Sequence, residues 1–226
     1  MNYLYIFSIL YFVNFSLIAQ NFIDSDGLRQ GKWAKDYPWG TPRFEGSFED
    51  DKEVGLFRFY DQNGKLISQR VYQSPGNISD AILFLPNGAI EAKGRYQGKN
   101  KIGKWEYYNL RGFLVSTEFY LEGLKDGLET VFYSDSLIAE KVNWKNGMKN
   151  GTWEEYDSLG KIDLKANYAN NKLNGRYARY YPSGRKRIIG SYKMGLKHGS
   201  WTYYNADGSQ DKNEIFDLDD LVPDTK

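Results

Sequence analysis

The sequence contains no cysteine and a single histidine, His198, among its 226 residues. Without cysteine there can be no disulfide, no thiolate metal ligand and no cysteine nucleophile. The charges nearly cancel, with 30 basic against 29 acidic side chains. A chain with so little net charge has no overall field that would attract nucleic acid or anionic lipid. We therefore expect no nucleic-acid partner, and we expect recognition to depend on local surface.

The first twenty residues also lack charged side chains, and the first basic residue is Arg29. The apolar stretch from Tyr3 to Ala19 suits a secretory signal better than a membrane span of about 20 residues, and Ala19 is the small residue expected beside a cleavage site. We predict a signal peptide at residues 1–20 and an exported, periplasmic or extracellular protein. An uncleaved N-terminal membrane anchor is the alternative, because Leu17 is larger than a signal usually carries at that place.

Glycine and aromatic residues recur with a period of 24 residues. The grid positions are Gly31, Gly55, Ser79, Gly103, Gly127, Gly151, Gly175 and Gly199. A second glycine column follows nine residues later, with Ser136 as its exception. Seventeen residues after the grid positions stand Phe48, Tyr72, Tyr96, Tyr120, Trp144, Tyr168, Tyr192 and Phe216. Aromatic residues at every place of one column, in a chain with 17% aromatics, establish eight tandem units.

Each unit has the pattern of a β-hairpin. The grid glycine opens a motif G-x-W-x-x-Y in residues 103–108, 151–156 and 199–204, and pairs such as Asn63-Gly64 then indicate a tight turn. The following residues alternate between apolar and polar, as in a half-buried strand. We predict an all-β fold at residues 21–216: an elongated antiparallel meander of about sixteen short strands in one twisted layer.

Two units and the C-terminus depart from this pattern. Unit three has Ser79 and Ala81 in place of glycine and aromatic, and unit five carries Glu129 and Ser136, so both hairpins are expected to be irregular. The acidic residues 217–226 follow the last aromatic of the grid. They are expected to form a short cap or a disordered tail.

Units such as residues 103–123 and 151–171 resemble the variant MORN repeats of bacteria, including the group often labelled YwqK-type antitoxins. The resemblance covers about Gly27 to Phe216. It implies a repeat fold, and it leaves scaffolding, membrane association, attachment to catalytic domains and an antitoxin-like role open. The end of the predicted signal, Ala19-Gln20, also resembles exported proteins of Bacteroidetes-type bacteria.

The residue types of catalytic and metal sites are scarce or poorly placed. His198 stands in a turn column of variable chemistry, and the acidic clusters near both termini lack the spacing of a calcium loop. Glu106 and Glu154 share a column that varies freely, as solvent-facing strand positions do, although a facing carboxylate pair could serve a glycosidase. We predict no catalytic residue, no metal and no cofactor, and hence a protein that is not an enzyme.

Two aromatic columns are candidates for a binding surface, and because their offsets have opposite parity we expect them on opposite faces of the sheet. Cross-strand stacking explains much of both columns, and a groove for a peptide, a glycan or a partner subunit is the functional alternative. The candidate contact residues are Trp105, Trp153, Trp201, Tyr108, Tyr156, Tyr180 and Tyr204.

A basic stretch between Gly175 and Lys193 is a candidate for weak contact with membrane lipid. Its cations are Arg176, Arg179, Arg185, Lys186 and Arg187. An ordinary charged outer face, which protects exposed strands, is the simpler interpretation. The sequence thus favours a non-catalytic scaffold for protein–protein interaction in the cell envelope, bound to an unknown protein or to a second copy. A lipid-associating module and an antitoxin-like binder of an exported toxin are the alternatives.

Overall fold

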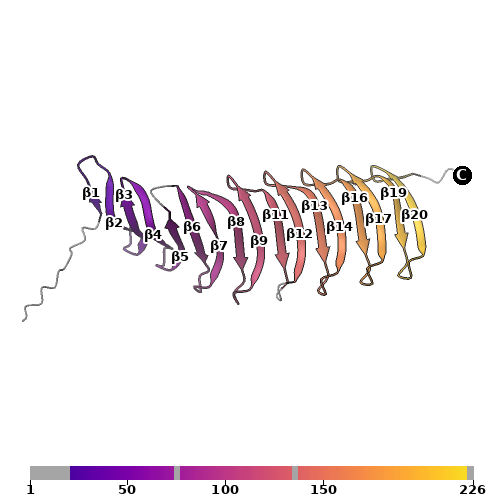
Figure 1. Ribbon diagram of the computed structural model, residues 1–226, viewed down its shortest axis with the longest axis horizontal. Helices are drawn as coiled ribbons and strands as arrows, with labels where there is room; N and C mark the ends of the chain where they lie inside the picture. The colour runs from indigo at the N-terminus through magenta and orange to yellow at the C-terminus, as the bar shows by residue number, and fades with distance from the viewer. Residues whose placement is uncertain (1–20, 74–76, 134–136, 223–226) are drawn as a thin grey trace, which may run out of the picture.

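The computed structural model describes residues 21–73, 77–133 and 137–222, and these form one long antiparallel sheet (Figure 1). The signal peptide predicted at residues 1–20 lies outside the described residues, as does Ser136. The described ranges contain no helix of the length and apolarity needed to cross a membrane.

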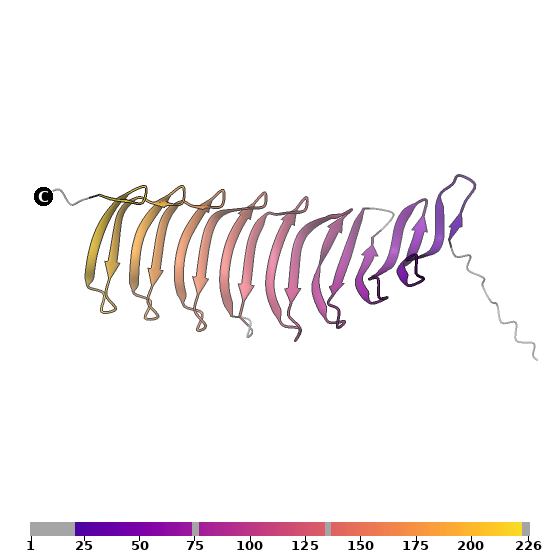
Figure 2. The same cartoon turned by 180° about the vertical axis from the view of Figure 1, so that it is seen from behind.

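Sixteen of the strands have six to nine residues, which confirms the predicted meander. They are β2 (Arg29–Asp36), β3 (Pro42–Glu49), β4 (Lys52–Tyr60), β5 (Leu66–Tyr72), β6 (Ile78–Phe84), β7 (Ile90–Gln97), β8 (Asn100–Tyr108), β9 (Leu114–Leu121), β11 (Gly127–Phe132), β12 (Ile138–Lys145), β13 (Met148–Tyr156), β14 (Ile162–Ala169), β16 (Gly175–Tyr180), β17 (Lys186–Lys193), β19 (Gly199–Tyr204) and β20 (Gln210–Asp217). Each pairs with its neighbours along the chain, and within the described residues no second layer covers the sheet (Figures 1 and 2).

Five shorter strands complete the sheet. They are β1 (Phe22–Ile23), β10 (Leu124–Lys125), β15 (Lys172–Leu173), β18 (Leu196–Lys197) and β21 (Asp220–Val222). Pairing of β21 with the end of β20 joins Phe216 to Leu221, so the first part of the acidic C-terminus caps the sheet.

The turns that link successive units are bonded to one another along one edge of the ribbon. Asn170 and Asn171 both have positive φ, 50° and 65°, as a two-residue type I′ turn requires. The N–H of Asn171 donates to the carbonyl of Lys149 at 2.9 Å, and the Asn171 side chain accepts from the Lys149 N–H at 2.7 Å. Asp51 with Arg29 and Asp219 with Lys197 repeat this pair of bonds. This row of turn-to-turn hydrogen bonds holds each unit in register with the one before it.

A bulge at the grid glycine interrupts the ladder between most units. At Gly103, whose φ is 62°, the pairing passes from Lys93↔Glu106 to Arg95↔Ile102 and skips three residues of β8. Ser79 has no positive φ, and β5 pairs with β6 without interruption. The expected irregularity of unit three is therefore wrong for this pair of strands, because the glycine conformation is what breaks the ladder elsewhere.

The core of this single-layer protein is a row of aromatic rings laid on glycines. Trp105 is 0% exposed and covers Gly94 so closely that a Cβ there would lie 2.2 Å from the indole. Tyr96 and Tyr120 meet the same ring edge-on, with centroids 5.0 and 6.4 Å away. Burial of an aromatic ring removes about 150–250 Å² from water, worth about 4–6 kcal/mol.

This arrangement recurs every 48 residues, that is, every second unit. Phe57 covers Gly46 and Trp201 covers Gly190 in the same way as Trp105 covers Gly94. In the remaining pair Val142 replaces the glycine, and its neighbour Trp153 is only half-buried. The structural repeat of the core is therefore a pair of 24-residue units.

A methyl group at Gly94 should disrupt the aromatic core. We expect Gly94→Ala to lower the free energy of unfolding by about 1–3 kcal/mol, because the Trp105 ring must move off the sheet. Trp105→Ala alone should cost about 3–5 kcal/mol. Urea unfolding of both single variants and the double variant tests the contact. Strict additivity in the double variant would contradict it, since removal of the ring abolishes the clash.

Candidate binding surface

The two faces of the sheet carry different side chains, as the parity of the two aromatic columns predicts. We call the face with Trp105, Tyr107 and Tyr120 the core face, because these three rings pack on one another there. We call the opposite face, with Glu106 and Tyr108, the outer face. The two residues on this face are joined by a hydrogen bond of 2.8 Å from the Tyr108 hydroxyl to the Glu106 carboxylate.

The tryptophans predicted to bind a partner belong to the core. Trp105 and Trp201 are 0% and 2% exposed, so no partner can touch them, and we remove them from the candidate surface. Trp153 is half-buried on the same face, where its indole N–H donates to Glu140 at 2.8 Å. The sequence could not separate these positions from exposed ones, because the burial of a ring depends on the glycine or valine of the strand opposite.

The four candidate tyrosines lie on the outer face, half-buried. Tyr156 repeats the contact of Tyr108, with its hydroxyl 2.6 Å from Glu154. Burial, and then the hydrogen bond to the glutamate, raise the pKa of both Tyr108 and Tyr156 to about 12. The hydroxyls are thereby fixed as donors to carboxylates, while both side chains stay partly exposed. Tyr180 lines a hollow of about 410 Å³ in units six and seven, and Tyr204 holds the equivalent place in unit eight.

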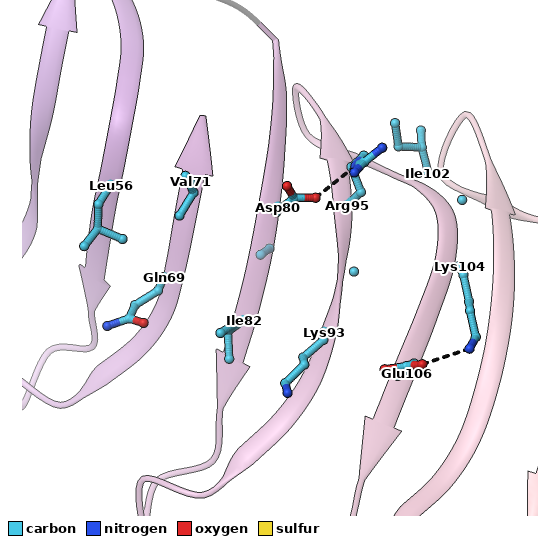
Figure 3. Close-up of a pocket in the computed structure, with 13 residues that line it drawn as sticks. Leu56, Gln69, Val71, Asp80, Ile82, Lys93, Arg95, Ile102, Lys104 and Glu106 are labelled. Atoms are coloured by element: carbon cyan, nitrogen blue, oxygen red, sulfur yellow. Dashed lines mark hydrogen bonds and ion pairs between the residues drawn. The ribbon is translucent and has the colours of Figure 1, made fainter. Parts of the chain in front are cut away.

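A groove crosses the outer face from β4 to β8 (Figure 3). It encloses about 570 Å³. Apolar side chains reach it from four strands: Leu56, Val71, Ile82 and Ile102. The ion pairs Asp80–Arg95 at 2.9 Å and Lys104–Glu106 at 2.8 Å frame it. Sequence analysis missed this groove.

The groove depends on the uninterrupted ladder of unit three. Leu56, Val71, Asp80, Arg95 and Ile102 lie directly opposite one another across consecutive strands and make one continuous row. A second row runs beside it through Gln69, Ile82, Lys93 and Glu106. The missing glycine at Ser79 was the signal in the sequence, since it marks the place where the ladder is not broken.

The five basic residues between Gly175 and Lys193 do not form one patch. Arg176 is exposed on the outer face. Arg179 forms ion pairs with Glu155 and Asp163, and its Nε donates a hydrogen bond to the Tyr177 hydroxyl. Arg185 lies in a turn and donates to the carbonyls of Ala206 and Asp207 in the next turn. Lys186 and Arg187 are exposed near that edge, and Arg187 lies over the Tyr181 ring.

The core face also holds a charged network that sequence analysis did not predict. Lys125 lies between Glu118 and Glu129, at 2.7 and 2.8 Å, and Trp144 donates to Glu129 at 2.6 Å. Burial lowers the pKa of Lys125, but the two carboxylates outweigh this effect and leave it raised. Lys101, one unit earlier, lies over Trp105 at 4.4 Å. Lysine at the same place in four units was the available signal: Lys101, Lys125, Lys149 and Lys197.

Residues considered for chemistry are held apart in the described part of the chain. Glu106 and Glu154 lie four strands apart, about 19 Å at the spacing of a sheet, whereas a glycosidase pair lies within about 10 Å. The nearest carboxylate to His198 belongs to Asp217, 3.3 Å from its Nδ1. No group of three metal-ligating side chains occurs within residues 21–73, 77–133 and 137–222.

The raised tyrosine pKa values predict a loss of stability at high pH. An unfolded tyrosine ionises near pH 10, so Tyr108 and Tyr156 stabilise the fold fully below pH 10 and lose that contribution between pH 10 and 12. We expect the urea midpoint of the Tyr108→Phe/Tyr156→Phe variant to fall less steeply over this interval than that of the wild type. Equal slopes would contradict the assignment. Glu106→Gln/Glu154→Gln should reduce the slope by a smaller amount.

Comparison with known proteins gives a family match at two places. The MORN repeat variant model matches residues 53–74 and 149–170, which correspond to units two and six. No curated protein matches the chain. The solved structures similar to it include a mutant of S. aureus TarM in complex with fondaparinux, alpha-GlcNAc-glycerol and UDP, with 12% identity over 42% of this chain and a TM-score of 0.33. A second TarM structure has 14% identity over 44% and a TM-score of 0.32.

The chain spans about a fifth of the length of these TarM chains, 19% and 20%. The family matches are stronger than this structural likeness, because both fall on the repeat grid and begin two residues before a grid glycine, Gly55 or Gly151. The other units share the same grid and the same hairpin. At least two of the eight units are therefore similar to MORN repeats of the variant type.

Proposed function

We propose that this protein is a non-catalytic scaffold that binds another protein through its outer face, in the cell envelope. MORN repeats are in general repeat modules of binding or scaffold type. The observation that carries the proposal is the groove of about 570 Å³ with its apolar floor and charged frame. Grooves with a few fixed polar groups around apolar side chains are typical binding sites.

The exposure of the groove supports a protein partner. Leu56 and Val71 are 41% and 47% exposed and stand next to each other on adjacent strands. Covering them would remove apolar surface from water at about 25 cal/mol per Å². Tyr108 and Tyr180 extend the same face toward the C-terminus, and tyrosine is enriched among the residues that anchor protein interfaces. A second copy of the chain is one such partner.

The distribution of polar groups favours binding over catalysis. The carboxylates of Glu106 and Glu154 are held by tyrosine hydroxyls and lysines, and these bonds lower the pKa of both glutamates. A carboxylate held ionised in this way is a poor general acid at neutral pH. The lipid-associating alternative loses support, because the five cations assigned to it lie on different faces and edges.

The cell envelope follows from the uncharged apolar N-terminus, and we propose that the signal peptide is removed by cleavage beside Ala19. The antitoxin-like role is compatible with the same surface, and it would then cover an exported toxin. Mass spectrometry of the protein from the host's envelope fraction should find Gln20 or Asn21 at the N-terminus. Recovery of the intact N-terminus in the membrane fraction would favour the uncleaved anchor.

Site-specific photo-crosslinking in the native host tests the scaffold proposal. A photoreactive residue at Val71, in the groove, should capture a single stoichiometric protein partner. The same residue at Leu159, which is 75% exposed in a turn, is the matched control and should capture little. Equal capture at both positions, or capture of lipid alone, would contradict the proposal. Self-links at Val71 would assign the groove to a homo-oligomer.

A further inference from the structure

The outer face carries an excess of positive charge that the whole chain does not have. The residues that line the groove of about 570 Å³ and the hollow of about 410 Å³, together with Lys141 opposite Glu154, include six cations: Lys93, Arg95, Lys104, Lys141, Lys165 and Arg176. They hold three carboxylates: Asp80, Glu106 and Glu154. The difference, six minus three, is three positive charges around the groove and the hollow, in a chain whose net charge is +1.

All three carboxylates are already bound within the face. Asp80 pairs with Arg95 at 2.9 Å, and Glu106 pairs with Lys104 at 2.8 Å. Glu154 pairs with Lys165 at 3.2 Å. Each carboxylate thus neutralises one cation, and the other three cations are left without a counter-ion on this face.

Lys93, Lys141 and Arg176 are those three cations, and none has a carboxylate within 4 Å among the described residues. Lys93 and Lys141 lie directly opposite Glu106 and Glu154, whose charges are shared with Lys104 and Lys165. Each ammonium instead lies over a tyrosine ring of the outer face. Lys93 is 5.4 Å from the centroid of Tyr108, and Lys141 is 5.6 Å from that of Tyr156.

Two cations of the core face are each held by two carboxylates. There Lys125 has two carboxylates, Glu118 and Glu129, and Arg179 has Glu155 and Asp163. Lys125 and Arg179 are therefore neutralised inside the protein. Lys101, Lys149 and Lys197 of the same face lie over rings of the aromatic core.

The spacing of the three cations suits an extended chain lying along the ribbon. From Lys93 on β7 to Lys141 on β12 is four strand spacings, about 19 Å, and Arg176 on β16 lies three spacings further, about 14 Å. The total of about 33 Å is the length of about ten extended residues. The strands between them all belong to the same antiparallel sheet (Figure 2).

The hollows distinguish such a chain from a membrane surface. Lys93 lines the groove of about 570 Å³, and Arg176 lines the hollow of about 410 Å³ that also contains Tyr180. Side chains of a partner segment can enter the two hollows beside these cations, whereas a flat layer of lipid headgroups cannot follow the hollows. Apolar side chains of the same segment would meet Leu56, Val71 and Ile82 (Figure 3).

We propose that the outer face binds an extended, acidic segment of a partner protein, with carboxylates bound to Lys93, Lys141 and Arg176. The inference rests on the proposed scaffold function and names the chemistry of its partner. A first acidic residue would bind Lys93. Acidic residues about six and about ten positions further along the segment would then reach Lys141 and Arg176. Apolar residues near the acidic residue that binds Lys93 would fill the groove.

Binding of short peptides to the mature protein tests this inference. The probe is a labelled twelve-residue peptide of alternating glutamate and leucine, and its matched control has lysine in place of glutamate. At low salt the acidic peptide should bind and the basic one should not, and affinity should fall as salt rises. Lys93→Gln/Lys141→Gln/Arg176→Gln should weaken binding by about tenfold or more and flatten the salt dependence, since each pair contributes a few-fold.

A second triple variant, Lys52→Gln/Lys99→Gln/Lys172→Gln, removes the same charge from exposed lysines outside the groove and hollows and should change the affinity less than twofold. Equal loss in both triple variants, or equal binding of the basic peptide, would overturn the inference. So would vesicles of anionic phospholipid that bind more tightly than the peptide and depend on the same three cations. If Val71 still crosslinks its partner in the first triple variant, the scaffold function stands and the acidic segment fails.

Discussion

The contact between an aromatic ring and the glycine opposite it supports the rest of this structure. A single-layer sheet has no second layer to bury its apolar residues against, so it must build a core on one of its own faces. Trp105 does so by lying flat on Gly94 under Tyr96 and Tyr120, and it is completely buried as a result. The turn-to-turn hydrogen bonds and the grid bulges position successive strands for this contact.

Concentrating the apolar contacts on one face leaves the other face for recognition. The outer-face tyrosines are tied at their hydroxyls to glutamates, as Tyr108 is to Glu106, and these polar contacts leave ring surface exposed. The face is hollowed where the ladder runs unbroken through Ser79, and it carries cations that its own carboxylates do not neutralise. One face therefore holds the core and the other is free for recognition, because the sheet has only one layer.

Pairing of units adds a second level of order. Glycine lies under an aromatic ring at Gly46, Gly94 and Gly190, with a spacing of 48 residues or a multiple of it, and Val142 is the exception. Junctions with a glycine under an aromatic ring therefore alternate along the ribbon with junctions that lack this contact. At the junction of units two and three Ala81 stands at the ring position and Arg70 at the glycine position, and Arg70 lies over the Tyr96 ring at 4.0 Å.

The sequence by itself determined the architecture: the sixteen long strands, their order and the opposite faces of the two aromatic columns. These features depend on local patterns, namely turn glycines and alternation within a strand, which repeat eight times. Only the tertiary structure decided which rings are buried, where the outer face is hollow and which cations lack a partner. Each depends on the residue opposite, as Trp105 depends on Gly94 and Trp153 on Val142, and that neighbour lies on another strand, where bulges reset the register.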